Sequence, residues 1–235
     1  MTQILKPTIL ITGASKGLGA EIAEHYLNQG HKVVSLSRSA SVVHENHLQY
    51  QADISIEADI LYVIKDLKSK KIPIDVLINN AGIASMNFMV STPLTTAASI
   101  FNTNVLGSFL VTREISKMMI LQKAGRIINI SSVSLPLHLE WQSIYASSKA
   151  ALEEFTRIIA KELAPFNVTA NILGPNPMAT DLIHGIPESN LNKVLERQSI
   201  KKMGMPSDVI HCLDFFMSEK STAITGQTIY LNGVF

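Results

Sequence analysis

Short apolar, β-branched segments alternate along the chain with longer segments in which apolar residues recur at helical spacing. The short segments predict strands at residues 8–12, 32–37, 47–52, 75–79, 125–131, 167–172 and 227–231. The longer segments predict helices at residues 17–29, 57–70, 95–122, 144–164 and 206–217. Such alternation is typical of a parallel sheet with helices on both faces. We therefore expect an α/β fold with a doubly wound parallel sheet of about seven strands.

The connection between the second and third predicted strands is short. Only Ser39 to Asn46 separate them, whereas a crossover between parallel strands normally takes a dozen or more residues. We expect a loop or a single helical turn there instead of a full helix.

Several predicted strands end in segments that suit a ligand. The glycine-rich residues 13–19, Asn80, Ser132 and Pro175 each follow a strand. In a doubly wound sheet, ligands bind beyond the carboxyl ends of the strands, where the strand order reverses. We expect these four segments to converge on that edge.

Composition excludes several classes of function. The 235 residues are 46% hydrophobic, which suits one large domain with a full core. The net charge is +1 and the largest basic cluster, residues 68–71, is typical of a solvated helix end, so nucleic acid is not an expected partner. No N-terminal segment resembles a signal peptide, and no apolar segment reaches the roughly 18 residues of a membrane span. We expect a cytoplasmic protein without a membrane partner.

Metal and disulfide chemistry are not expected either. Cys212 is the only cysteine, and its apolar neighbours favour a small core residue over a reactive thiol. His44 and His47 are three residues apart without a third ligand. We predict no metal site.

The segment Gly13-Ala-Ser-Lys-Gly-Leu-Gly19 lies between a predicted strand and a predicted helix. In that context, glycines let the backbone approach a pyrophosphate, and the helix N-terminus favours its negative charge. The alternative is a glycine-rich turn without a ligand.

Ser132, Tyr145 and Lys149 suggest acid–base chemistry. Tyr145 and Lys149 are four residues apart, so they share one face of a helix. An ammonium beside a phenol favours the phenolate and would lower the pKa of the tyrosine from about 10. Ser132 ends a predicted strand and could hold a carbonyl oxygen nearby. A tyrosine and a lysine at this spacing are common in helices, so the pair alone could be structural.

Together these residues resemble the short-chain dehydrogenase/reductase family over nearly the whole chain. The matching motifs are Thr12 to Gly19, Asn79-Asn80-Ala81-Gly82, Asn104 with Gly107, and Ser132, Tyr145 and Lys149 at the family's spacing. Within the family, the chain is most similar to β-ketoacyl-[acyl-carrier-protein] reductases. The resemblance implies a single Rossmann-type domain over residues 1–235. Its cofactor half would span about residues 1–130, and its catalytic and substrate elements about residues 131–235.

The resemblance also implies a set of site residues. The implied catalytic residues are Asn104, Ser132, Tyr145 and Lys149. The implied cofactor-binding residues are Gly13, Ser15, Lys16, Gly17, Leu18, Gly19, Arg38, Asp53, Ile54, Asn80, Ala81, Gly82, Tyr145, Lys149, Pro175, Met178 and Thr180. Asn104 would hold a water that links Lys149 to solvent. From the residues alone, it could instead mark a helix kink or a buried polar contact.

The residues at the end of the second strand predict the cofactor. Relatives that prefer NAD carry an acidic residue there, whereas this chain has Ser37 followed by Arg38. Lys16 lies in the glycine loop. Two cations without a carboxylate suit a 2′-phosphate, so NADP(H) is the predicted cofactor. Asp53 resembles the family's aspartate beside the adenine, with a cap close to a helix as the alternative.

Two further positions leave alternatives open. Ser131 is a rival for Ser132, which the spacing to Tyr145 favours. His138, between the serine and the tyrosine, could contact substrate, although a structural or solvent-exposed role fits it as well.

The substrate side of the predicted site is apolar. The relevant residues are Leu135 to Trp141, Met86, Phe88, Met89, Met178, Leu182, Met203 and Met205. Thioethers and aromatic rings suit an acyl chain, and the alternative is a loop core.

Three departures from the family put details in doubt. Asn176-Pro177 replaces a glycine-containing motif and should stiffen the loop that frames the nicotinamide. Gly233-Val234 replaces paired glycines near the C-terminus. Of two basic positions that carrier-protein reductases use near the active-site entrance, Lys123 matches one and Phe166 replaces the other.

The predicted function is NADPH-dependent reduction of a ketone to a secondary alcohol. The substrate would be a small-molecule carbonyl compound or alcohol, most simply a β-ketoacyl thioester, with or without an acyl-carrier protein. The alternatives are an NADP-dependent alcohol, sugar or steroid dehydrogenase, and a non-catalytic dinucleotide-binding regulatory protein. The apolar surface of the helices at 95–122 and 144–164, with Val105, Phe109, Leu152, Phe155 and Ile159 as examples, predicts a homo-oligomer. A tetramer is favoured over a dimer.

Overall fold

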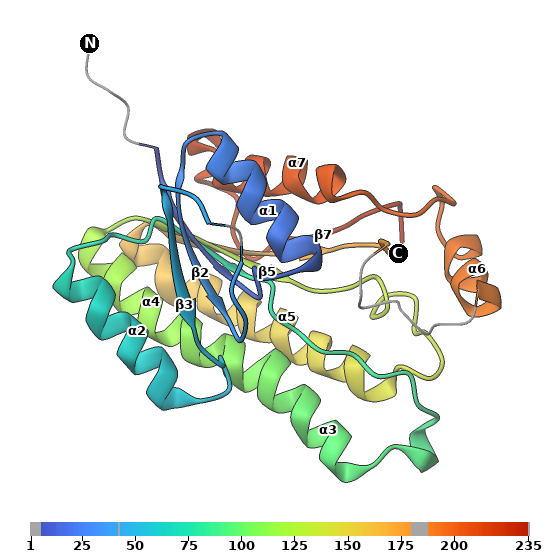
Figure 1. The fold of residues 1–235 in the computed structure, drawn as a ribbon. Coiled ribbons are helices and arrows are strands. Elements are labelled where there is room, and N and C mark those ends of the chain that lie inside the picture. The colour runs from blue at the N-terminus through green and yellow to red at the C-terminus, as the bar shows by residue number, and fades with distance from the viewer. Residues whose placement is uncertain (1–5, 42, 180–187, 235) are drawn as a thin grey trace.

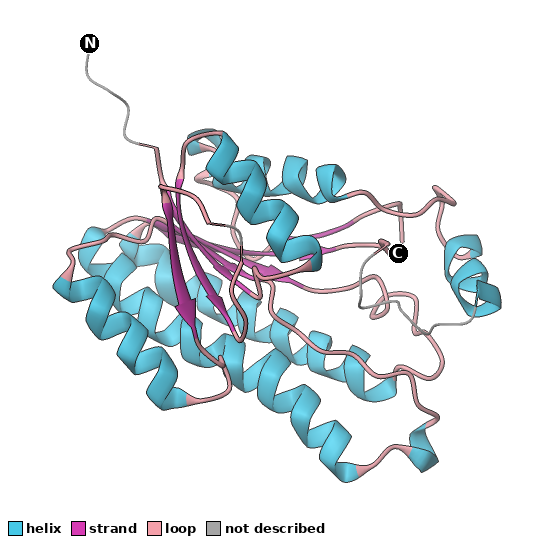
Figure 2. Ribbon diagram, in the orientation of Figure 1, coloured by secondary structure: helices cyan, strands magenta, loops and turns pink. Residues whose placement is uncertain are grey.

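A seven-stranded parallel sheet forms the centre of the protein, in a computed structural model that describes residues 6–41, 43–179 and 188–234. The strand order is β3-β2-β1-β4-β5-β6-β7, and each strand is parallel to its neighbours. Figure 2 shows the sheet lying between the helices. The strands are β1 (Thr8–Thr12), β2 (Lys32–Ser37), β3 (His47–Gln51), β4 (Val76–Asn79), β5 (Gly125–Ile130), β6 (Val168–Gly174) and β7 (Thr228–Tyr230). The predicted fold class and all seven predicted strands are confirmed.

Helices cover both faces of the sheet (Figure 1). On one face lie α1 (Gly17–Asn28) and α7 (Pro206–Met217), and on the other lie α2 (Glu57–Ser69), α4 (Ser108–Gln122) and α5 (Ser143–Leu163). The helix α3 (Leu94–Phe101) continues through a π-helical segment, Asn102–Gly107, into α4. A further helix, α6 (Glu188–Glu196), stands apart from both layers (Figure 1). It was not predicted, because it is short and only Leu191, Val194 and Leu195 follow an apolar helical pattern.

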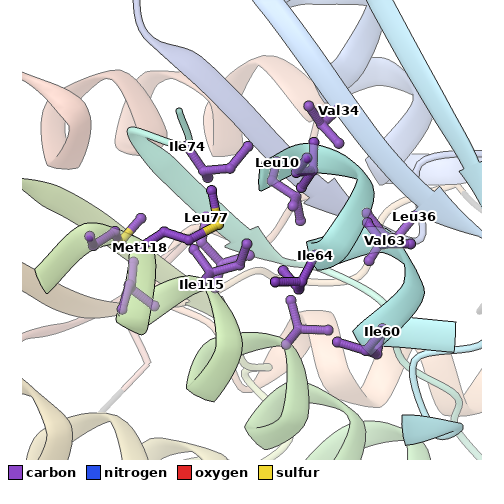
Figure 3. Close-up of a cluster of buried hydrophobic side chains, with 14 of the residues drawn as sticks. Leu10, Val34, Leu36, Ile60, Val63, Ile64, Ile74, Leu77, Ile115 and Met118 are labelled. Carbon is purple, nitrogen blue, oxygen red and sulfur yellow. The ribbon is translucent and has the colours of Figure 1, made fainter. Parts of the chain in front are cut away.

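The core consists of two apolar clusters, one on each face of the sheet. In β1, Leu10 faces the α2 and α4 side, while Ile9 and Ile11 face the α1 and α7 side. Figure 3 shows the first cluster, in which Leu10 and Leu77 lie close to helical residues such as Ile115. Because helices cover both faces, the central strands are apolar along their length instead of alternating with polar residues.

The connection from β2 to β3 is a loop. No residue of 38–41 and 43–46, the part of this connection that the structure describes, is helical. The expectation of a loop or a single turn is confirmed, and β3 still pairs with β2 in parallel, with Leu48 opposite Val34.

One helix corrects an expectation about membranes. Because α3, the π-helical segment and α4 are continuous, Leu94–Gln122 forms one helix of 29 residues whose most apolar window has a mean hydropathy of 1.2. Among the described residues it is therefore long and apolar enough to cross a membrane. Helices that pack against a sheet in a protein core pass the same test, and here α4 packs against β4 and β5.

Candidate active site

A cleft of about 640 Å³ lies beyond the carboxyl ends of the strands. The chain reverses direction across the sheet between β1 and β4, which is where a doubly wound sheet binds its ligand. The cleft brings together, from the predicted cofactor and catalytic residues, Gly13, Ser15, Lys16, Gly17, Leu18, Gly19, Arg38, Asp53, Ile54, Asn80, Ala81, Gly82, Ser132, Tyr145, Lys149, Pro175 and Met178. Asn104 lies behind it, and Thr180 is outside the described residues, as is Leu182.

The glycine loop is shaped for close backbone contact. A Cβ on Gly19 would lie 2.3 Å from the Gly13 carbonyl oxygen and 2.5 Å from Asn80 Nδ2. Gly13 has a φ of +69°, a conformation that side chains other than glycine's rarely adopt. Both positions therefore require glycine.

Thr12 locks this loop to the loop after β4. Its hydroxyl oxygen accepts hydrogen bonds from the backbone N–H groups of Asn80 and Ala81, both at 3.0 Å. The Asn80 side chain donates back to the Thr12 carbonyl at 3.0 Å. Thr12 was not among the predicted site residues, although its place at the end of β1 could have indicated this role.

The start of α1 suits a phosphate group. Gly17, Leu18 and Gly19 form its first turn without a carboxylate, and all three line the cleft. Backbone N–H groups and the helix dipole at such an end favour an anion. The residues present therefore fit a dinucleotide pyrophosphate.

The end of β2 lacks a carboxylate, as the sequence indicates. The Ser37 hydroxyl donates to the Ser39 carbonyl at 2.8 Å, while Arg38 and Lys16 are exposed and line the cleft. Asp53 Oδ1 accepts from the backbone N–H and the hydroxyl of Ser55 at 2.9 and 2.7 Å. Asp53 thus holds the turn before α2 and also lines the cleft. The structure is therefore compatible both with a cap close to a helix and with a place beside the adenine.

Burial and hydrogen bonding act in opposite directions on Asp53. Burial raises the pKa of its carboxyl group, whereas the Ser55 hydrogen bonds and the Arg38 charge lower it. The net effect is a lowered pKa, so Asp53 carries a negative charge close to Arg38 at neutral pH.

Ser132, Tyr145 and Lys149 meet at the floor of the cleft. The Ser132 hydroxyl hydrogen-bonds the Tyr145 phenol. Lys149 Nζ lies 5.7 Å from the centroid of the Tyr145 ring and donates to the Ile130 carbonyl at 2.8 Å. Tyr145 and Lys149 are both buried, at 6% and 4% exposure, which removes most of the water that would otherwise screen their charges.

The expected lowering of the tyrosine pKa by Lys149 is wrong for this structure. Burial raises the pKa of Tyr145, and only the hydrogen bond with Ser132 opposes it. Burial also lowers the pKa of Lys149 to about 8, partly offset by the charge of Glu153. The lysine therefore retains its proton less readily than a free lysine, and it donates to a carbonyl oxygen.

The two neighbouring serines have different partners. The Ser131 hydroxyl donates to Glu153 Oε1 at 2.5 Å, whereas that of Ser132 reaches Tyr145. This geometry favours Ser132 as the serine that faces a substrate.

Asn104 sits in the π-helical segment and is fully buried. Its side chain accepts from the Ile83 N–H at 2.9 Å and donates to the Ile83 carbonyl and the Ser148 hydroxyl, both at 3.0 Å. A Cβ on Gly82 would lie 3.3 Å from Asn104 Oδ1 and 3.5 Å from Lys149 Nζ. Asn104 thus lies at a helix irregularity and also makes a buried polar contact, and both it and Lys149 approach Gly82.

Asn176 does not strain the loop after β6. Its φ is not positive, so the position does not require the glycine that it replaces. The side chain is buried, donates to the Lys202 carbonyl at 3.2 Å and packs against Gly204, where a Cβ would lie 2.2 Å from Asn176 Oδ1. Asn176 therefore fastens the loop to residues 202–204 through its side chain.

The substrate end of the cleft is apolar, but fewer of the predicted residues line it. Met86, Val133, Leu139 and Met178 do, together with Leu191 and Val194 of the unpredicted α6. Phe88 and Trp141 pack against each other outside the cleft lining, with ring centroids 5.1 Å apart. The Asn87 N–H donates to the Trp141 carbonyl at 2.9 Å, which joins the two loops.

Lys123 and Phe166 are not at the cleft of their own chain. Lys123 follows α4 directly before β5, and Phe166 lies directly before β6. Both therefore lie at the amino edge of the parallel sheet, opposite the cleft. The expectation that Lys123 marks the entrance is wrong within a single chain, because a residue that directly precedes a strand of this parallel sheet lies at the edge opposite the cleft.

The structure gives Cys212 no features of a reactive thiol. Burial raises the pKa of the half-buried Cys212 thiol, and the neighbouring Asp208 charge raises it further. Within the described residues, no group of three or more His, Cys, Asp or Glu side chains could hold a metal.

Comparisons with known proteins agree with this geometry. A family model described as short chain dehydrogenase matches residues 7–190. The chain is 33% identical to the 3-oxoacyl-[acyl-carrier-protein] reductase of Buchnera aphidicola, over 98% of each chain. It is 26% identical to a solved 3-ketoacyl-(acyl-carrier-protein) reductase from Brucella melitensis complexed with NADH, with a TM-score of 0.88, covering 97% of this chain and 98% of that one. It is 27% identical to the ligand-free aldohexose dehydrogenase of Thermoplasma acidophilum, with a TM-score of 0.87, over 98% of this chain and 94% of that one.

Proposed function

Because the chain belongs to the short chain dehydrogenase family, whose members are oxidoreductases of carbonyl and alcohol groups, we propose that it reduces β-ketoacyl thioesters with NADPH. The observation that carries the proposal is the buried group of Ser132, Tyr145 and Lys149 at the floor of the cleft. The product would be the secondary alcohol.

Each of these residues has a role that follows from its position. A dinucleotide bound along residues 13–19, Arg38 and residues 80–82 would supply hydride to the carbonyl carbon. The Ser132 hydroxyl would hold the carbonyl oxygen, and Tyr145 would protonate it. The raised pKa of Tyr145 keeps the phenol protonated at neutral pH, which is the form that reduction requires.

Lys149 and Asn104 would support this proton transfer. Protonated Lys149 would bind the nicotinamide ribose, as the family resemblance implies. Asn104, which contacts Ile83 and Ser148 behind it, would support the return of a proton from solvent.

The preference for NADPH rests on Arg38 and Lys16, with Ser37 in place of a carboxylate. Both cations line the cleft, and a guanidinium can bind a 2′-phosphate through two parallel hydrogen bonds. The alternative is a preference for NADH, which the similar Brucella reductase binds in its solved structure.

The preference for a thioester with an apolar chain rests on the lining of the substrate end. Met86, Leu139, Met178 and the two α6 residues offer apolar surface. The similarity to an aldohexose dehydrogenase supports a sugar as the second candidate. A sugar needs several polar side chains to pair its hydroxyls. Ser134 and Gln142 line the cleft with side-chain oxygens that have no partner among the described residues, which favours this candidate.

A direct assay separates the candidates. The protein is mixed with NADPH and a short β-ketoacyl thioester, and the absorbance of the reduced nicotinamide is followed. Loss of absorbance with wild type but not with Tyr145→Phe supports the proposal. Turnover of sugars or simple alcohols with NADP⁺, without turnover of the thioester, would favour the second candidate. Tight binding of NADPH without oxidation by any carbonyl compound would favour a regulatory protein.

We also propose that the protein assembles through α4 and α5. Phe109 of α4 and Ile158 of α5 are exposed, at 40% and 50%, and so is Leu106 of the adjoining π-helical segment, at 53%. Of the residues cited from the sequence, Leu152 and Ile159 instead face the core, because they lie on the other side of α5. A tetramer is favoured, and light scattering that gives a monomer mass at micromolar concentration would contradict assembly.

A further inference from the structure

Glu153 carries a buried carboxylate that the proposed mechanism does not use. It is 1% exposed and lies one helical turn after Lys149 on α5. Its Oε1 accepts from Ser131 Oγ at 2.5 Å and from the Tyr230 hydroxyl at 2.6 Å, while its Oε2 accepts from Arg157 at 2.8 Å. A charge in the interior is costly unless donors surround it, and here three donors from three elements do so.

The reach of Tyr230 to Glu153 depends on a glycine. Tyr230 of β7 pairs with Gly174 of β6, and a Cβ on Gly174 would lie 2.2 Å from the tyrosine ring. The ring therefore crosses β6 directly over this glycine. Arg157 strengthens the same connection, since it also donates to Thr228 of β7 at 3.2 Å. The network thus joins β7, β6 and α5 to the end of β5.

The network holds the segment that carries Ser132. The Ser131 side chain is fixed to Glu153, and its backbone N–H donates to the Leu173 carbonyl at 2.7 Å. With Ser131 anchored at both points, the next residue presents its hydroxyl to Tyr145.

The Glu153 carboxylate also stabilises the positive charge of Lys149. The groups near the ammonium are the Ile130 carbonyl of β5, the Tyr145 ring of α5, and Gly82, which Asn104 also approaches. None of these is charged at neutral pH. Within the part of the chain that the structure describes, Glu153 is the charged group that acts on Lys149, and it opposes the effect of burial.

We propose that Glu153 is a positioning residue of the active site: it anchors Ser131 beside Ser132 and supplies the negative charge that keeps Lys149 protonated. It contacts neither substrate nor cofactor in this role. The use of Lys149 rests on the proposed function, but the protonation of Lys149 can be measured without any turnover.

The test compares two variants that each remove one negative charge from the same helix. Glu153→Gln keeps the shape and accepting oxygen of the side chain. Glu154→Gln is the matched control, because Glu154 is the next residue, is 66% exposed and also pairs with Arg157. Lys149 is titrated in the free protein by ¹³C NMR of its side chain, with Lys149→Arg to assign the signal.

The expected result is specific to the buried carboxylate. The pKa of Lys149 should fall by roughly one unit in Glu153→Gln, the lower end of the effect of a neighbouring opposite charge. It should stay near the wild-type value in Glu154→Gln. The alkaline limb of kcat/KM should move to lower pH by the same amount, which a merely structural role would not cause.

Two outcomes would overturn the inference: an unchanged titration of Lys149 in a folded Glu153→Gln protein, or an equal shift in Glu154→Gln. If Glu153→Gln does not fold, the double variant Glu153→Met, Tyr230→Phe replaces it, because removing the tyrosine hydroxyl together with the carboxylate leaves fewer buried donors unpaired. Since the titration uses no substrate, it stands even if ketoacyl reduction is not found. Absence of turnover with a shifted Lys149 would contradict the proposed function alone.

Discussion

The two ends of the cleft are built in different ways. At the cofactor end, glycines and backbone N–H groups form the surface, and Thr12 and Asn80 hold the two loops together. At the substrate end, side chains from three distant segments form it, including Leu191 and Val194 of α6. A surface made of backbone leaves a fixed pattern of glycines in the sequence, whereas a surface made of side chains tolerates many residue types.

The largest expected effect lies between the two ends, at Tyr145. Tyr145→Phe removes the transferable proton but keeps the ring. Turnover should fall by at least the roughly 10²-fold typical of lost acid–base catalysis, while NADPH binding, measured by fluorescence titration, should persist. Near-normal turnover would rule out the proposed mechanism.

The next effect tests the cofactor end. Arg38→Ala should weaken NADPH binding by about 1.5–3 kcal/mol, or roughly 10- to 150-fold, as expected for a hydrogen bond to a charged group. NADH serves as the internal control, because it lacks the 2′-phosphate, and its affinity should change little. Equal losses for both dinucleotides would show that Arg38 does not recognise the phosphate.

A pH profile of the reaction tests Lys149, which lies at the floor of the cleft between the two ends. Burial lowers the pKa of Lys149 to about 8, so the ammonium loses its proton as the pH rises through that value. The kcat/KM for reduction reports groups of the free enzyme and should fall about tenfold per pH unit above the pKa. Tyr145 must also be protonated, but its raised pKa moves its own loss of activity to higher pH than that of Lys149. A profile that stays flat to pH 10 would contradict this role of Lys149.

The smallest effect belongs to the substrate end. Trp141→Ala removes the partner of Phe88 and loosens the contact between the two loops. An aromatic pair of this kind contributes about 0.5–1.5 kcal/mol beyond its buried area. Because neither ring lines the cleft, this energy is an upper bound, and the KM for a long-chain thioester should rise by at most roughly 2- to 12-fold. Phe215→Ala, at an exposed position on α7, is the control. A loss of NADPH affinity in Trp141→Ala would show that the two ends are not independent.

The sequence was most informative where one local rule decides the structure. The strands and the glycine loop follow from apolar patterning and from the need for backbone approach at Gly13 and Gly19. The helix α6 was missed because its apolar pattern is too short to stand out. The place of Lys123 between a predicted helix and a predicted strand already indicates the amino edge of a parallel sheet.

The electrostatics of the site depend on contacts that are distant in the sequence. Lys149 was expected to lower the pKa of Tyr145, but burial affects both groups more strongly. That burial arises from the packing of α5 against β5 and the π-helical segment, which no spacing reveals. The link from Glu153 to Tyr230, 77 residues later in the chain, likewise appears only in three dimensions.

The π-helical segment makes the long helix sensitive to its exact number of residues. Such a segment accommodates an extra residue within an otherwise α-helical element, and each residue turns an α-helix by about 100°, at 3.6 residues per turn. The wider turn absorbs this rotation for the extra residue, so deleting a single codon within residues 102–107 would let the segment become ordinary α-helix and leave α3 and α4 in nearly the same relative orientation. The side chains inside the segment would change direction instead. Asn104 would then turn away from Ile83 and Ser148. A deletion too small to unfold the protein would thus disconnect the back wall of its active site.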